Sequence, residues 1–278
     1  MRPKELLELP AVWRTMRSPL RYLLARRGAR GAAGAEVELR GGIVARLRDG
    51  TRDGHVFHRI FIGDEYRLRE LDLEGGWVVD VGAHGGFFAL RAAMAGARVL
   101  CVEPAPVNLE LLRAQIARNR LEGRVVVRAG ALGAKAGRAT LRCDGDPYGY
   151  AVARAGAAAP AEGRALEVDC TTLEALLDEH GVDRCLLLKL DCEGSEYGIL
   201  GAASDAALRR CERIRMELHV TPGEEEAPLG LRRRLEAAGF RVDLDERKRN
   251  GRQGYLFCTR AAGAAPAAGA RPRAASRA

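Results

Sequence analysis

Residues 77–104 read WVVDVGAHGGFFALRAAMAGARVLCVEP and contain a complete strand–helix–strand pattern. The apolar run WVVDV predicts a buried strand, and the glycines that follow it predict a turn. FFALRAAM predicts a helix that ends before Gly96, and ARVLCVE predicts a second strand. This order predicts a crossover unit with two parallel strands.

The same alternation continues to residue 260. The sequence predicts helices over 105–120, 171–181 and 229–240, the second of them capped by Thr and ended by Gly. It predicts strands over 124–132, 185–191, 213–219, 241–246 and 254–260, and added strands over 138–145 and 165–170. Residues 42–62 predict extended segments around Asp-Gly turns. The pattern therefore predicts an α/β fold with a mostly parallel sheet and helices on both faces.

Four parts are predicted along the chain. Residues 1–35 form a basic arm with an amphipathic helix broken at Pro10 and Pro19; the arm packs on the domain, is loose, or makes a weak membrane-surface contact through residues 1–30. Residues 36–75 form an extended, hairpin-like lead-in, and residues 76–260 form the α/β domain. Residues 261–278 are rich in Ala and Arg and predict a disordered tail.

Composition excludes several classes of protein. With 47% apolar and 29% charged side chains, the 278 residues fit a soluble globular protein. The net charge of +8 is concentrated at the two ends and leaves a body of about −1, so no nucleic-acid partner is expected. Seven cysteines without a CxxC pair indicate a reducing compartment, and no signal-peptide core or membrane span is visible, which predicts a cytoplasmic protein. Nothing in the sequence indicates an oligomeric state.

Polar residues gather where the predicted strands end. In an open parallel sheet, ligands bind outside the carboxyl ends of the strands. The glycine turn at 82–86 would let the backbone approach a ligand closely, and an acid at the end of the next strand would accept ribose hydroxyls. The strand-end residues are Asp80, Glu103, Asp191, Glu193, Glu217 and His219.

The charges favour one nucleoside cofactor over another. The dinucleotide fingerprint requires glycines where this chain has His84 and Phe87, and Asp80 beside the turn would repel a phosphate. S-adenosylmethionine lacks phosphate and carries an ammonium and a sulfonium, which acids attract. Two alternatives stay open: an NAD(P)-dependent oxidoreductase, and a non-catalytic binding module that docks through its basic arms.

Six segments occur in the order found in FkbM-family S-adenosylmethionine-dependent methyltransferases. They are VVDVGAHGGFFALRAA, VLCVEPAPVNLELLRAQI, AGALG, TTLEAL, LLLKLDCEGSEYGIL and RIRMELH. The chain resembles this family over about residues 36–260. The resemblance implies a Rossmann-like class I methyltransferase fold with a seven-stranded sheet, and methylation of hydroxyls on sugars, glycans, polyketides or related small metabolites.

The resemblance also implies cofactor positions. Gly82, Gly86 and Glu103 would bind the cofactor, with Ala131 and Leu132 beside the adenine. The chain departs from the family where His84 replaces the usual Asn and Glu174 replaces the usual Asp. Together with the strand-end argument, the predicted cofactor residues are Asp80, Gly82, Ala83, His84, Gly86, Phe87, Glu103, Pro104, Ala131, Leu132 and Asp191.

The segment KLDCEGSE at 189–196 supplies the first candidates for the chemistry. We expect Asp191 to contact the cofactor ammonium or the acceptor hydroxyl. Lys189 either pairs with an acid or takes part in catalysis, and Glu193 would face the acceptor. Glu196 opens the next helix, where a cap is its expected role.

The strand 213–219 supplies the remaining candidates. Glu217 and His219 share one strand face, and His219 is either a base with an ordinary pKa near neutral or a structural residue. Asp191, Glu193, Glu217 and His219 offer hard metal ligands, but no HxH or DxD spacing accompanies them, so no metal is predicted. The predicted catalytic residues are Asp191, His219, Glu217, Glu193 and Lys189.

Two further segments, one before and one after the strand–helix–strand unit at 77–104, each have two possible roles. His55, His58 and Tyr66 either cover the cofactor or pack inside the domain. The Gly/Ala-rich loop at 151–163 is either a lid over the acceptor or disordered.

Overall fold

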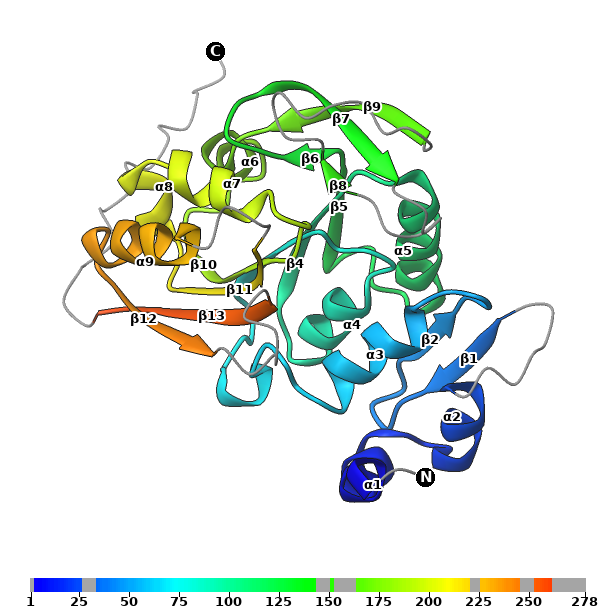
Figure 1. Ribbon diagram of the computed structural model, residues 1–278. Helices are drawn as coiled ribbons and strands as arrows, with labels where there is room; N and C mark the ends of the chain where they lie inside the picture. Colours follow the sequence, from blue (N-terminus) through cyan, green and yellow to red (C-terminus); the bar gives the residue numbers. More distant parts are fainter. Residues whose placement is uncertain are drawn as a thin grey trace, which may run out of the picture.

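The computed structural model describes residues 3–26, 34–143, 151–152, 164–220, 226–245 and 253–261. A seven-stranded sheet with the order β12-β13-β11-β10-β3-β4-β5 forms the centre (Figure 1). Only β13 runs against its neighbours, so the predicted mostly parallel sheet is confirmed. Its strands are β3 (Trp77–Val81), β4 (Arg98–Glu103), β5 (Val125–Ala129), β10 (Cys185–Leu190), β11 (Arg213–His219), β12 (Phe240–Asp245) and β13 (Gln253–Arg260).

Helices cover both faces of this sheet, as the sequence predicts. Neighbouring strand residues alternate between two apolar clusters: Val78 joins the first and Val79 the second. The first cluster includes α3 (Asp53–Phe61), α4 (Phe87–Met94) and α5 (Pro106–Arg118). The second includes α6 (Leu173–Glu179), α7 (Glu196–Ala202), α8 (Asp205–Arg210) and α9 (Ala227–Ala237). The Thr172 hydroxyl caps α6 by accepting from the Ala175 amide at 3.3 Å, as predicted.

A smaller sheet lies beside the end of the main one. It has the order β6-β9-β7-β8 and contains β6 (Ala131–Leu132), β7 (Gly137–Cys143), β8 (Ala151–Val152) and β9 (Arg164–Thr171). The antiparallel pair of β7 and β9 confirms the two added strands. Most of the proposed lid, residues 153–163, lies outside the described residues, as does the tail from residue 262.

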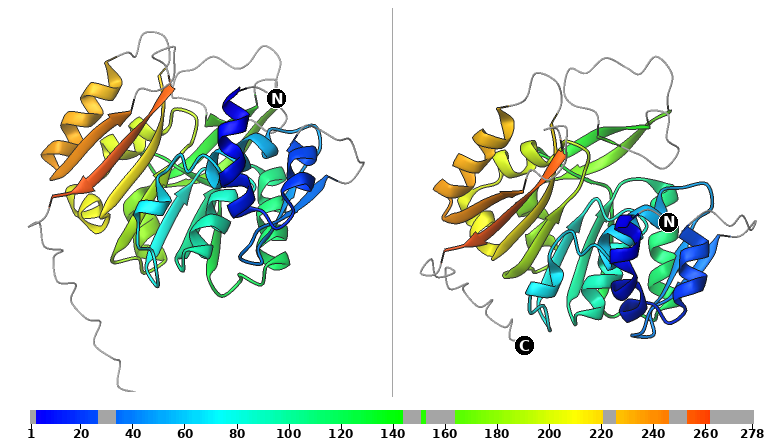
Figure 2. Two further views of the ribbon diagram at one scale, coloured as in Figure 1. Left: turned by 90° about the horizontal axis from the view of Figure 1, so that it is seen from below. Right: turned by 60° about the horizontal axis from the view of Figure 1, so that its bottom comes forward.

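The N-terminal part packs against the domain. It contains α1 (Pro3–Thr15), α2 (Pro19–Arg26), and the antiparallel hairpin of β1 (Ala35–Glu38) and β2 (Val44–Leu47) (Figure 2). The predicted break at Pro19 is confirmed, but the break at Pro10 is wrong because α1 continues through it. A proline inside a helix costs about 3 kcal/mol. Val12 and Met16, which follow Pro10, are buried in the core of the domain, and this burial offsets part of that cost.

The extended structure predicted after the hairpin is wrong for residues 53–61, which form α3. The Asp-Gly pair at 53–54 suggested a turn, but Asp53 instead occupies the first turn of a helix, where a carboxylate is favourable. Phe57, Ile60 and Phe61 then fall on one buried side at helical spacing. A short helix, η1 (Leu68–Glu70), follows before β3.

No helix among the described residues is long and apolar enough to cross a membrane.

Candidate active site

The glycine turn follows β3, at the point in the sheet where the order of the strands reverses. From β3 the sheet is built outward through β4 on one side, and from its neighbour β10 through β11 on the other. Gly82 has φ +73°, and a Cβ there would lie 1.9 Å from the Asp191 carbonyl oxygen. The turn after β3 therefore closes tightly on the residue after β10, and this switch point is where open α/β sheets bind ligands.

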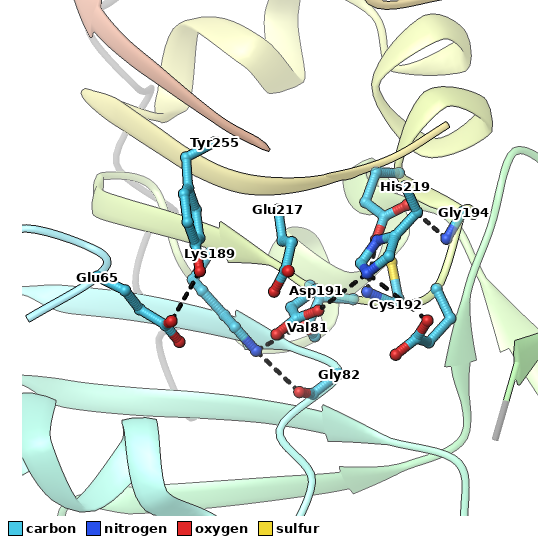
Figure 3. A network of polar contacts seen from close by, with 12 residues as sticks. Glu65, Val81, Gly82, Lys189, Asp191, Cys192, Gly194, Glu217, His219 and Tyr255 are labelled. Atoms are coloured by element: carbon cyan, nitrogen blue, oxygen red, sulfur yellow. Dashed lines mark hydrogen bonds and ion pairs between the residues drawn. The ribbon is translucent and has the colours of Figure 1, made fainter. Parts of the chain in front are cut away.

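Lys189 and Asp80 form a buried ion pair beneath this turn. The Lys189 Nζ lies 3.0 Å from Asp80 Oδ1. It also donates to the Gly82 carbonyl at 2.8 Å (Figure 3). Burial alone would lower the pKa of Lys189, but Asp80 and Asp191 more than offset it and raise the pKa. The lysine thus stays charged and fixes the carboxyl end of β3.

Glu103 ends β4 with its carboxylate turned back to the glycine turn. Its Oε2 accepts the His84 amide at 2.7 Å, and its Oε1 accepts the Ala105 amide at 2.9 Å and the Asn108 side-chain amide at 3.4 Å. The side chain is buried, and this burial raises the pKa of Glu103. A buried carboxylate at this position is a suitable acceptor for hydroxyl donors.

His84 occupies the left-handed region of backbone space, with φ +51°. Asn and His are among the residues that adopt this region most readily, which explains how His replaces the family's usual Asn. Burial lowers the pKa of His84 to about 4, so its ring is neutral near pH 7. Among the described residues, its buried Nδ1 has no hydrogen-bond partner.

Arg48, which sequence reasoning missed, ties the hairpin to the glycine turn. Its guanidinium donates to both Asp53 oxygens at 2.8 and 2.9 Å and to Asn108 Oδ1 at 3.1 Å. Its Nη2 lies 3.3 Å from His84 Nε2. Asp53 is fully buried, so this cluster sets the position of His84 and of the Asn108 amide that reaches Glu103. No spacing rule links Arg48 to residues that lie 36 and 60 positions away.

The turn after β10 is closed by Glu196. Its two oxygens accept the Cys192 and Gly194 amides, each at 2.7 Å, so Glu196 holds the turn before α7 and does not cap the amides of that helix. Glu193 and Gly194 have φ of +54° and +100°, so the chain reverses sharply at this point. The reversal places Asp191, Glu193 and Glu196 around one position.

His219 lies at that position (Figure 3). Its Nδ1 is 3.1 Å from Glu196 Oε1, and its Nε2 is 3.6 Å from Glu193 Oε2 and 3.9 Å from Asp191 Oδ1. Burial opposes the charge on the ring, but Glu196, Asp191 and Glu193 outweigh it and raise the pKa of His219 to about 9. The ordinary pKa assumed from the sequence therefore does not apply, because three acids surround the ring.

We expect His219 to make folding stability depend on pH. A folded-state pKa of about 9, above the ordinary 6.5, gives stability that is fully present below about pH 6.5 and is lost as pH rises through about 9. The shift corresponds to about 3 kcal/mol. Urea unfolding of the wild type and His219→Asn between about pH 6.5 and about pH 9.5 measures it. The free energy of unfolding of the wild type should fall toward that of His219→Asn as the pH rises over this range. A difference between the two proteins that stays constant with pH would contradict the raised pKa of His219.

Asp191 stays ionised at the same edge. Burial would raise its pKa, but Lys189, His219 and a hydrogen bond from Tyr66 lower it overall. The Tyr66 hydroxyl donates to Asp191 Oδ2 at 2.8 Å. Of the three residues expected to cover the cofactor or pack, Tyr66 thus reaches the site.

The two histidines of α3 lie elsewhere. His58 is buried between the Tyr22 hydroxyl, 2.7 Å from its Nδ1, and Glu8 Oε2, 3.0 Å from its Nε2. A covering role for His58 is wrong because α1 and α2 pack over it. His55 is exposed.

Glu217 is buried two residues before His219 and pairs with Arg59 of α3 at 2.6 Å. Arg59 also contacts Glu65 and Tyr255, and the Tyr255 hydroxyl donates to Glu65 at 2.7 Å. Sequence reasoning missed Arg59, Glu65 and Tyr255, which come from three separate segments and carried no motif.

The remaining predicted cofactor positions lie in three places, which are the glycine turn and the start of α4, the end of β4, and β6. Phe87 opens α4 and packs into the core against Phe57, with ring centroids 6.0 Å apart. Gly86 has φ +88° at the start of the same helix. The others are Ala83, Ala131 and Leu132, which are buried, and Pro104, which is half-buried.

Asp191, Glu196 and His219 bring ligand atoms within 4.8 Å of one another, the one such group in the described part of the chain. Two of them are already engaged, because Glu196 accepts two backbone amides and His219 holds a proton near neutral pH. A metal would have to displace both arrangements, so we keep the prediction of no metal.

Comparison with known proteins identifies the family. A family model for the methyltransferase FkbM domain matches residues 80–242. A curated relative, 31-O-demethyl-FK506 methyltransferase FkbM from Streptomyces tacrolimicus, is 30% identical over 236 residues, which cover 72% of this chain and 90% of the relative.

Solved structures align over much of the chain at low identity. Methyltransferase FkbM from Methylobacillus flagellatus aligns with 92% of this chain at 15% identity and a TM-score of 0.46, and this chain spans 60% of its length. A putative transferase from Pyrococcus horikoshii aligns with 82% of this chain and 71% of its own, at 13% identity and a TM-score of 0.46. The sequence matches and the strand order agree with the class I methyltransferase fold that the resemblance implied. The chain therefore belongs to the FkbM family of methyltransferases.

Proposed function

We propose that the protein uses S-adenosylmethionine to methylate a hydroxyl group of a small molecule or glycan. The observation that carries this proposal is the charge of the switch point, where the ionised Asp191 and the buried Glu103 flank the glycine turn after β3. The Streptomyces tacrolimicus relative is named for an O-linked methyl group on a small molecule, which favours a hydroxyl acceptor here.

The residues present fit this cofactor. Glu103 would accept the ribose hydroxyls, and Asp191 would hold the ammonium. The buried, neutral His84 lies beside the turn with an unused ring nitrogen for the nucleoside. Once bound, the cofactor supplies a methyl group on a sulfonium.

His219 is our candidate for the proton acceptor. Its Nδ1 is held by Glu196, so its Nε2 faces Asp191 and Glu193. In the free protein the ring is protonated, because the acids raise its pKa to about 9. A cation held by Asp191 would offset part of that negative charge and lower the pKa of His219. The ring would then release its proton more readily and could accept the proton of the acceptor hydroxyl at Nε2.

The other candidates receive supporting roles. Glu193 is half-exposed beside Nε2 and would face the acceptor. Lys189 and Glu217 are buried in ion pairs, so we propose that they position Asp80 and Arg59 and do not touch the substrate. The free cysteines among the described residues fit the proposed cytoplasmic location.

An NAD(P)-dependent oxidoreductase fits the site less well. A pyrophosphate would meet Asp191 and Glu103 at the switch point, where like charges repel. Calorimetric titration with S-adenosylhomocysteine and with NADH separates the two functions. We expect binding of the first alone, followed by transfer of labelled methyl groups to metabolites or glycans of the host; binding of NADH alone would overturn the proposal.

We expect Arg48→Lys to weaken S-adenosylhomocysteine binding about tenfold, which corresponds to about 1.4 kcal/mol. Lysine keeps the charge but cannot reproduce the guanidinium fork that joins Asp53 to Asn108. Arg46→Lys, at an exposed position of β2 two residues earlier, is the matched control and should bind as the wild type does. Calorimetry measures both; an unchanged affinity in folded Arg48→Lys would contradict the role of this cluster.

A further inference from the structure

The two N-terminal helices carry large apolar side chains that the domain leaves exposed. Leu7 and Trp13 on α1 are 81% and 51% exposed, and Leu20 and Leu24 on α2 are 68% and 61% exposed. These four make up half of the large exposed apolar side chains in the described part of the chain. We call the surface formed by Leu7, Trp13, Leu20 and Leu24 and the arginines among them the N-terminal face.

The backbone beneath this face is fixed. Val12, Met16 and Tyr22 point inward and are buried, and the Tyr22 hydroxyl lies 2.7 Å from His58 Nδ1. The Arg40 side chain donates to the Trp13 carbonyl at 2.9 Å. Figure 2 shows α1 and α2 on the outside of the molecule beside α3 and the hairpin. The exposed side chains are therefore displayed by packed helices and are not part of a loose arm.

The two helices and the turn between them carry a net positive charge, because residues 3–26 contain one lysine and four arginines against Glu5 and Glu8. Arg14, Arg17 and Arg21 are exposed, and of these Arg17 pairs with Glu38 at 2.6 Å. Of these two acids, Glu8 is turned toward His58. Arg14 and Arg21 have no acidic partner among the described residues. The N-terminal face thus combines Leu and Trp with unneutralised arginine.

We infer that the N-terminal face docks on an anionic lipid surface. Interfacial helices combine Trp and Leu with Arg in this way: the apolar side chains enter the boundary between headgroups and acyl chains, and the arginines meet the anionic headgroups. The charge complementarity favours anionic lipid over a neutral bilayer. Neither helix spans the bilayer, so the attachment is peripheral and reversible. This inference does not depend on the methyl acceptor or on the cofactor.

Fluorescence of Trp13 gives a direct test. The chain has two tryptophans, so Trp77→Phe leaves Trp13 as the only one. We expect its emission to shift to shorter wavelength with vesicles of phosphatidylcholine and phosphatidylglycerol, but not with phosphatidylcholine alone. Sedimentation of the wild-type protein with the same vesicles is the second measurement. Binding should weaken between about 0.1 M and about 1 M salt, as the Debye length falls from about 10 Å to about 3 Å.

Matched variants test whether vesicle binding depends on the N-terminal face or on exposed apolar and cationic residues in general. Leu20→Glu and Arg21→Glu should each weaken vesicle binding about tenfold by removing an apolar or a cationic contact. Leu229→Glu on α9 and Arg209→Glu on α8 change residues that are also exposed but lie far along the chain, and these variants should bind as the wild type does. Equal losses in all four variants would overturn the proposal. So would absence of binding to anionic vesicles, or a lipid-free complex with protein or RNA in which Trp13 is buried.

Discussion

Replacing Glu103 with Ala is expected to weaken S-adenosylhomocysteine binding at least about 100-fold. Two hydrogen bonds to a charged acceptor contribute about 1.5–3 kcal/mol each, and every 1.4 kcal/mol is tenfold in affinity. The carboxylate also holds the His84 and Ala105 amides, so its loss loosens the glycine turn as well. Calorimetry on the folded variant measures the effect.

Two further variants keep this prediction specific. Glu103→Gln preserves the shape of the side chain but removes its charge, and we expect an intermediate loss of affinity. Glu110→Ala changes an exposed acid on α5 and should bind as the wild type does. Wild-type affinity in folded Glu103→Ala would contradict the cofactor assignment.

Replacing His219 with Ala is expected to lower kcat by about 10²–10⁴, the usual contribution of a general base. Affinity for S-adenosylhomocysteine should change little, because the proposed cofactor contacts come from Glu103 and Asp191. We choose His219 as the base because of its geometry. Its Nε2 lies beside Asp191 and Glu193, while Glu196 holds the other ring nitrogen. Single-turnover methyl transfer and calorimetry on the same preparation separate turnover from binding.

His180→Ala provides the control, since this histidine ends α6 away from the switch point. It should leave both kcat and affinity unchanged. A His219→Ala enzyme with wild-type kcat would exclude His219 as the base. An equal loss of affinity and turnover would instead assign it to cofactor binding.

Much of the fold could be predicted because it depends on local patterns. Buried parallel strands appear as apolar runs, and Gly82 and Gly96 mark a turn and a helix end that any reader of the sequence can find. The strand-end acids follow from the same pattern, since parallel strands finish at one edge. The error at residues 53–61 arose where local signals competed. The Asp-Gly pair suggests a turn, whereas the spacing of the apolar residues favours a helix. The helix forms because it buries Phe57 and Phe61 in the core.

The surroundings of the site could not be predicted because they depend on contacts between distant segments. Arg59 meets Glu217, which is 158 positions away, and Tyr66 meets Asp191, which is 125 positions away. The pKa of His219 has the same origin, because it depends on three acids that the turn at 191–196 brings around the ring. The sequence identified His219 as a candidate, but its protonation state required the geometry.

A crystal structure grown with S-adenosylhomocysteine would show directly whether the nucleoside binds at the switch point. We expect the nucleoside at the switch point, with its ribose hydroxyls on Glu103 and its amino group on Asp191. A crystal with that nucleoside bound elsewhere, or with both carboxylates still turned to their present partners and no nucleoside beside them, would contradict it.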